Sequence, residues 1–221
     1  MNLPDGLLAG DWITAAWLLF LPLFLHAVWR APWRRLADSS RLNAWLGAIV
    51  FLTVVWSLKA GIKPGLSLHL LGAAVFTLSF GPRLAFIGLC GALLGVTLNG
   101  DGGWESYAAN ALLMAGIGVV ASTAVLRCCE RFLPHHFFVY IFVNGFFGGA
   151  LAIITVGAVA SGLLVTAGAY SADYVVGEYL PYVGLLAFSE AWLSGMVITL
   201  FVIYRPQWVA TFDDSRYLLG K

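Results

Sequence analysis

Long apolar stretches recur along this sequence, each bounded by charged residues or by glycine and proline. A run of about 17 to 25 predominantly apolar residues has the length of an α-helix that crosses a bilayer. Seven stretches are predicted as membrane spans: 12–29, 43–58, 66–80, 84–98, 106–126, 137–168 and 180–204. The pattern therefore predicts an all-α polytopic membrane protein with about seven transmembrane helices.

Three of these stretches depart from the ideal length. Segments 66–80 and 84–98 are short and only a Gly-Pro-Arg turn separates them, so they form either a tight pair of spans or a broken re-entrant element. Segment 137–168 would be about 48 Å long as one helix. It must therefore tilt strongly, extend past the bilayer or break near Gly157.

Composition agrees with a membrane protein and limits what else the chain holds. Of its 221 residues 61% are hydrophobic and 10% are charged, and the mean hydropathy is +0.88. Seven helices use roughly 140 positions, so we expect a single transmembrane domain over residues 1–221 and no separate soluble catalytic domain. A net charge of +1 gives no basic excess for neutralising phosphates, and nucleic acid is not an expected partner.

The basic residues predict an orientation. With the N-terminus outside, only Lys59 and Lys63 of the twelve Lys and Arg fall outside, as the positive-inside rule requires. The other ten are Arg30, Arg34, Arg35, Arg41, Arg83, Arg127, Arg131, Arg205, Arg216 and Lys221. Residues 1–10 lack the basic region of a cleavable signal peptide. We expect a multi-pass protein of the inner (plasma) membrane, with its N-terminus retained outside and its C-terminus in the cytoplasm.

Polar side chains inside apolar stretches are hypotheses about function, because each costs a few kcal/mol in hydrocarbon unless it is paired. His69 lies at the outer start of the third stretch with no partner nearby in the sequence; it is either a functional group or a satisfied core histidine. Asn110 lies in the fifth stretch, and Glu190 lies about ten residues into the seventh. Glu190 therefore takes part in ion passage or in an obligatory polar cluster, or it makes a simple hydrogen bond between two helices. The loop 99–105 predicts a glycine turn whose acidic residues cap a helix.

Five short segments carry a resemblance to a known family. They read MNLPDG at 1–6, HLLGA at 69–73 followed by Gly-Pro, GDGG at 100–103, ANALLMA at 109–115 and SEAWLS at 189–194. In this order they resemble the energy-coupling-factor permease family for cobalt and nickel uptake. The likeness touches both ends of the chain and is densest over residues 64–116.

The resemblance implies a metal site. In that family the metal is held by the terminal amine, by the backbone nitrogen and imidazole of the second residue, and by one histidine of the third helix. By position this nominates Met1, Asn2 and His69. Asp5 and Asp101, which fall on the same predicted outer face, would attract the cation or orient its ligands.

Residue 2 departs from the family. Asn2 stands where the family has histidine, so a nitrogen donor is replaced at best by a carbonyl oxygen. Amine, amide and imidazole nitrogens favour square-planar Ni(II) or Cu(II). With one of them missing, the cation is open among cobalt, nickel and zinc, and the site would draw on Asp101, Asn110 or a water.

The leading hypothesis is a substrate-capture subunit of an ATP-driven uptake system for a divalent transition-metal cation, not an enzyme, with no prosthetic group. The sequence contains no G-x-x-x-x-G-K-[ST] run. The resemblance therefore implies separate partners, a transmembrane coupling protein and cytoplasmic ATPase subunits that dock on the Arg-rich inner face.

Two other functions are open at this point. The chain could be a non-transporting scaffold of the same fold that has lost high-affinity metal binding through Asn2. It could also be an intramembrane serine hydrolase or protease. Ser161 and Ser194, each followed by glycine, are then the nucleophiles, with His69 or His26 as the base.

Overall fold

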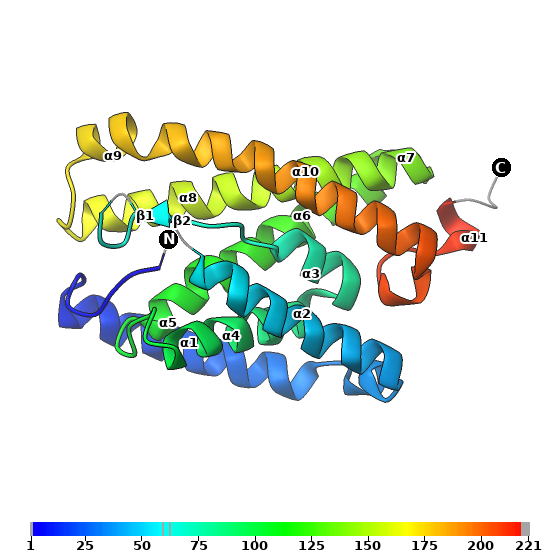
Figure 1. Ribbon diagram of the computed structural model, residues 1–221, viewed down its shortest axis with the longest axis horizontal. Helices are drawn as coiled ribbons and strands as arrows, with labels where there is room; N and C mark the ends of the chain where they lie inside the picture. The colour runs from blue at the N-terminus through cyan, green and yellow to red at the C-terminus, as the bar shows by residue number, and fades with distance from the viewer. Residues whose placement is uncertain (1, 59, 62, 218–221) are drawn as a thin grey trace.

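The computed structural model describes residues 2–58, 60–61 and 63–217. Its long helices lie side by side along the longest axis, with α8 and α10 on one side of the bundle and α1, α2 and α4 on the other (Figure 1). The elements are α1 (Gly10–Arg30), η1 (Trp33–Leu36), α2 (Ser39–Ser57), β1 (Ala60–Gly61), β2 (Ser67–Leu68), α3 (Ala73–Phe80), α4 (Pro82–Leu98), α5 (Tyr107–Asn110), η2 (Ala111–Ile117), α6 (Gly118–Phe132), α7 (Phe137–Val139), η3 (Tyr140–Phe147), α8 (Gly148–Thr166), α9 (Ala172–Glu178), α10 (Leu180–Tyr204), η4 (Pro206–Trp208) and α11 (Asp214–Tyr217).

Five helical segments of the described chain are long and apolar enough to cross a membrane. They are Gly10–Arg30, Ser39–Ser57, Tyr107–Phe132, Phe137–Thr166 and Leu180–Tyr204. Pro82–Leu98 is a shorter apolar helix. The predicted all-α polytopic membrane protein is confirmed; the count of seven spans and the orientation stay predictions.

Of the two alternatives for the stretch 66–80, a membrane span or a broken element, the structure has the broken element. Residues 66–72 are not helical, and α3 begins only at Ala73. Its eight residues span about 12 Å, which is too short to cross a bilayer. Gly72 has a φ of +69° and turns the extended chain into α3, and Gly81, with a φ of +79°, turns α3 into α4. Such backbone favours glycine, and the result is a broken element.

The stretch 137–168 runs without a break from Phe137 to Thr166. After the single α-helical turn α7, residues Tyr140–Phe147 have π-helical geometry, and α-helix then continues through Gly157. A Cβ at Gly157 would lie 2.6 Å from Val183 Cγ1. Gly157 therefore lets α8 and α10 approach closely, and the alternative of a break at this glycine is wrong.

Helix α3 lies at the centre of the bundle and positions the polar groups described below. All of its residues except Val75 are buried, and it packs against α4, α6 and α10. A buried, short helix leaves its unpaired terminal backbone groups inside the protein, where other elements must satisfy them.

Candidate functional site

Two extended segments, residues 2–5 and 66–72, meet at one end of the bundle. Ser67 belongs to the short strand β2, which pairs with β1 in antiparallel orientation. The backbone N–H of Asn2 donates to Ser67 Oγ at 3.1 Å. Side chains two residues apart in an extended chain share a face. The contact therefore places the backbone of residue 2 beside Ser67, two residues before His69. His69 itself is not among the residues that line the polar cavity described below.

The N-terminal segment is held by Asn110 at the end of α5. The Leu3 N–H donates to Asn110 Oδ1 at 2.7 Å, and Asn110 Nδ2 donates to the Leu3 carbonyl at 2.9 Å. Both residues are buried. The Asn110 amide thus pairs with the backbone of Leu3 as a neighbouring strand would, which is a positioning role.

The side chain of Asn2 presents an oxygen without a partner. Asn2 Nδ2 donates to the Asp101 carbonyl at 2.9 Å. Asn2 Oδ1 is buried and accepts no hydrogen bond. A buried acceptor left unpaired costs about 1 to 3 kcal/mol. This carbonyl oxygen has lone pairs with which it could coordinate a cation bound at the site.

Asp5 ties the N-terminal segment to the loop before α5. Its carboxylate accepts the backbone N–H groups of Trp104 and Ser106, each at 3.0 Å. A Cβ at Gly103 would collide with Asp5, so the loop needs glycine here. The sequence predicts that acids within the loop cap the helix; the capping acid is instead Asp5. The side chain of Asp101 accepts from Asn99 Nδ2 at 2.8 Å.

A polar cavity of about 640 Å³ opens at this end of the molecule. Its lining includes Asn2, Asp5, Lys63, Ser67 and Asp101. Within the described residues no group of three or more His, Cys, Asp or Glu side chains is arranged to hold a metal. The ligands implied by the resemblance are not a cluster of such side chains, because two of the proposed nitrogens belong to the backbone.

His69 has the hydrogen bonding of many metal-binding histidines. It is 5% exposed, and its ring centroid lies 5.3 Å from that of Trp56. Nδ1 lies 3.0 Å from the Leu70 carbonyl oxygen. In the tautomer in which Nδ1–H donates to this oxygen, Nε2 carries the lone pair, and a backbone carbonyl commonly orients a ligating histidine in this way.

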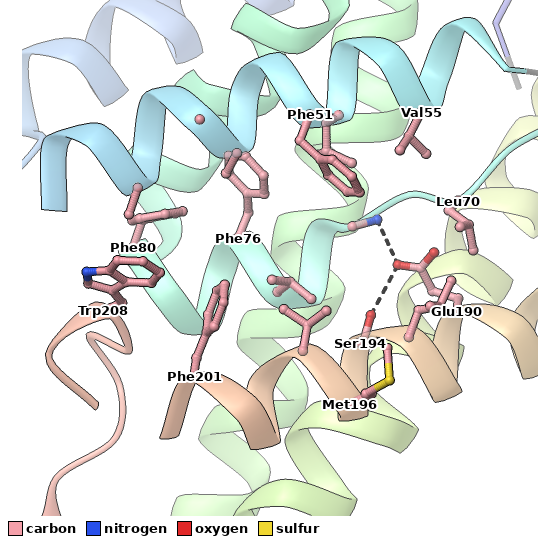
Figure 2. Close-up of a pocket in the computed structure, with 18 residues that line it drawn as sticks. Phe51, Val55, Leu70, Phe76, Phe80, Glu190, Ser194, Met196, Phe201 and Trp208 are labelled. Atoms are coloured by element: carbon pink, nitrogen blue, oxygen red, sulfur yellow. Dashed lines mark hydrogen bonds between the residues drawn. The ribbon is translucent and has the colours of Figure 1, made fainter. Parts of the chain in front are cut away.

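Glu190 on α10 holds the segment that carries His69. Its carboxylate accepts the N–H groups of Leu71 and Gly72, each at 2.7 Å, and the Ser194 hydroxyl at 3.4 Å. Figure 2 shows Glu190 pointing from α10 to this backbone, with Ser194 beside it. Glu190 is 1% exposed. These contacts form a buried polar cluster, and a role of Glu190 in ion passage stays a prediction.

The remaining predicted residues are placed as follows. Met1 lies outside the described residues. The hydroxyl of Ser194 donates to Glu190, and Ser161 Oγ is buried without a hydrogen-bond partner. Neither serine therefore has the histidine that a hydrolase would need. Ser67 was not nominated by the sequence, although its position two residues before His69 was a usable signal.

Comparison with known proteins gives a family match over most of the chain. The family model described as the cobalt uptake substrate-specific transmembrane region (CbiM) matches residues 2–208. The cobalt transport protein CbiM of Anoxybacillus flavithermus is 31% identical over 134 residues, which are 60% of this chain and 53% of that protein. Its counterpart in Salmonella typhimurium is 32% identical over 136 residues, 59% and 54% of the two chains. The chain thus matches about half the length of these curated relatives.

Two solved structures share the fold. The crystal structure of a truncated transition metal transporter has a TM-score of 0.78 and 20% identity, and the match covers 92% of this chain and 99% of the other. A second transition metal transporter has a TM-score of 0.75 and 20% identity, covering 91% and 92%. At this identity the likeness concerns the fold. The relatives and structures are named as transporters rather than enzymes.

Proposed function

The chain belongs to the family of the cobalt uptake substrate-specific transmembrane region, and from this premise we propose that it captures a divalent transition-metal cation for uptake. It is a multi-pass protein of the plasma membrane. The captured cation is cobalt, the metal in the names of its relatives, or the similar ions nickel or zinc.

The observation that supports this proposal most is the contact between the two extended segments. Because Asn2 N–H donates to Ser67 Oγ, the backbone nitrogen of residue 2 lies beside the segment that carries His69. The proposed ligands are the Met1 amine, the Asn2 backbone nitrogen and His69 Nε2. Ligation by the Asn2 nitrogen requires loss of its proton, which ends its bond to Ser67.

The buried oxygen of Asn2 bears on the choice of metal. Asn2 Oδ1 has no hydrogen-bond partner, so it is the proposed fourth ligand in place of the family's imidazole. An oxygen in that position weakens the preference of a nitrogen set for square-planar nickel. Asp5 and Asp101 line the polar cavity and are proposed to attract the cation through it.

The driving force is proposed to come from partner subunits. Because the sequence has no phosphate-binding G-x-x-x-x-G-K-[ST] run, ATP hydrolysis is assigned to separate cytoplasmic ATPases that act through a transmembrane coupling protein. Most of the arginines lie at the predicted inner end of the spans, which is the proposed docking face.

Elemental analysis of the purified protein tests the metal site. A chain that begins at Met1 is equilibrated with equal cobalt, nickel and zinc, and we expect one bound equivalent of metal. His69→Ala, or one residue added before Met1, should abolish it, while the control His26→Ala, at an exposed position on α1, should retain it. Full occupancy in both of the first two variants would contradict the site.

A stability measurement separates capture from a scaffold role. A ligand present at about 100 times its Kd stabilises the folded protein by about 2.7 kcal/mol. We therefore expect metal to raise the unfolding temperature of the wild type but not that of His69→Ala. A wild type that folds normally and shows no shift with any of the three metals would favour the non-transporting scaffold.

A further inference from the structure

A deep apolar groove runs between α2 and α10, with α3 as its floor. It has a volume of about 470 Å³, and its walls include Phe51, Phe76, Phe80 and Phe201. Figure 2 shows these side chains between the two helices, from Glu190 at one end to Trp208 at the other. Nearly all of its lining is apolar, and such a surface in a membrane protein is covered by lipid tails or by another apolar element.

The length of the groove matches one leaflet of a bilayer. Its lining on α2 extends from Ala44 to Val55, and on α10 from Glu190 to Phe201, twelve residues and so eleven helical steps in each case. At about 1.5 Å per residue this is roughly 16 Å, close to half of the hydrocarbon core of about 30 Å. A transmembrane helix of a partner would need a groove of twice this length. One acyl chain from one leaflet fits.

The end of the groove beside Trp208 carries positive charge. A second, smaller cavity shares Phe80 and Trp208 with the groove and is lined also by Arg35 and Arg41. Trp208 Nε1 donates to Ser40 Oγ at 3.0 Å, which ties η4 to the start of α2. Tryptophan is enriched at the level of lipid headgroups.

The charges at this end are not balanced within the described residues. Arg41 Nε is buried, makes no hydrogen bond and lies 3.8 Å from Asp38 Oδ2. Asp38 also accepts the Ser40 N–H at the start of α2. Arg35 is exposed and has no ion-pair partner among the described residues. Arg41 thus has one aspartate partner and Arg35, which lines the same small cavity, has none among the described residues, which leaves positive charge there for an anion.

We propose that an anionic phospholipid binds here, with one acyl chain in the groove between α2 and α10 and its phosphate at Arg35 and Arg41. Basic pockets beside transmembrane helices bind anionic headgroups, and each arginine near the membrane surface adds to the attraction. The bound chain excludes water from α3 and from the Glu190–Ser194 pair. This inference does not depend on the metal site.

The test compares lipids retained by the purified full chain, using native mass spectrometry. Phosphatidylglycerol and phosphatidylcholine with the same acyl chains are the probes. We expect the wild type to retain the anionic lipid about tenfold more than the zwitterionic one. The double variant Arg35→Gln, Arg41→Gln should lose this preference. Equal retention of both lipids by the wild type would overturn the proposal.

A groove-filling variant with a matched control tests the place of the acyl chain. Gly47 lines the groove on α2, and nothing lies within 4 Å of a Cβ built there. Gly47→Leu should therefore fold and expel both lipids. The control Gly184→Leu, on α10 outside the groove and equally unobstructed, should retain them. Retention in Gly47→Leu equal to that in Gly184→Leu would overturn the proposal, as would a wild type that holds no phospholipid because a second protein fills the groove.

Discussion

Two short non-helical segments lie within this helical membrane protein, and a buried polar side chain makes two hydrogen bonds to the backbone of each. Asn110 pairs with both the N–H and the C=O of Leu3. Glu190 accepts the N–H groups of Leu71 and Gly72. Both side chains belong to residues that are 1% exposed. The first of these side chains is a neutral amide and the second is a carboxyl group. Both form hydrogen bonds with backbone groups that have no partner within a helix.

The difference follows from which backbone groups each segment leaves unpaired. Leu3 presents one donor and one acceptor, and an amide matches both. Leu71 and Gly72 precede the first turn of α3, where only N–H groups lack partners. A carboxylate suits two donors and also the positive end of a helix. The unpaired backbone thus explains why Asn110 and Glu190 differ, and four predictions test this account.

The largest expected effect is that of Glu190→Ala. The change leaves two buried N–H groups without acceptors, at about 1 to 3 kcal/mol each. We expect a loss of about 2 to 6 kcal/mol in unfolding free energy, measured by denaturant unfolding in detergent. Glu178→Ala, at an exposed position, is the control. An equal effect of the two substitutions would show that Glu190 is not a clamp.

Exchanging the carboxyl and amide groups of the two side chains should lower the unfolding free energy less than removing Glu190 does. Glu190→Gln places an amide NH₂ against one backbone N–H, and Asn110→Asp places an oxygen against the Leu3 carbonyl. Each variant loses one of its two backbone bonds, and we expect about 1 to 3 kcal/mol in the same unfolding measurement. Asn43→Asp, at an exposed site on α2, should be near neutral. Wild-type stability in either clamp variant would mean that the choice of side chain does not matter.

Backbone strain at the turn into α3 should have an intermediate effect. Gly72 has a φ of +69°, and a Cβ there would lie 3.0 Å from Leu52 Cδ2. Gly72→Ala should lose about 1 to 2 kcal/mol from the left-handed backbone, plus the cost of moving Leu52. Gly100→Ala, with a φ of +83° and nothing within 4 Å, isolates the backbone cost. Thermal unfolding that ranks Gly100→Ala as the more damaging would contradict this.

The smallest effect is expected at Asp5, because its residue is exposed and water can replace the lost contact. Asp5→Asn keeps one acceptor for the N–H groups of Trp104 and Ser106 and loses the other. We expect a loss of about 0.5 to 1.5 kcal/mol in thermal unfolding. Glu105→Gln, at an exposed position in the loop that Asp5 holds, serves as the control. A loss at Asp5 as large as that for Glu190→Ala would remove the distinction between exposed and buried clamps.

The long apolar helices could be predicted from the sequence because their signal is local. The extended chain at 66–72 could not, since it depends on the positive φ of Gly72 and on Glu190, which lies more than a hundred residues away in the sequence. The stretch is as apolar as a helix, and hydropathy does not register a backbone bond to a distant carboxylate.

The predicted site residues were recovered with different degrees of detail. A histidine in an apolar stretch and the resemblance to the permease family both point to His69. Its contact with the Leu70 carbonyl adds an orientation of the ring that no sequence pattern gives. The sequence offers Asn110 as a group on which the metal site would draw, but its contacts are those of a backbone clamp. Ser67 was missed because a serine hydroxyl in an apolar stretch most often bonds to its own helix.

The central claim is that residue 2 and His69 belong to one metal site, and hydrogen exchange tests it most directly. Amide exchange is followed by mass spectrometry in residues 2–8 and 66–72, with and without cobalt or zinc. Metal should slow exchange in both segments together, and His69→Ala should remove the protection from both. Protection of one segment alone, or protection that survives His69→Ala, would contradict the claim.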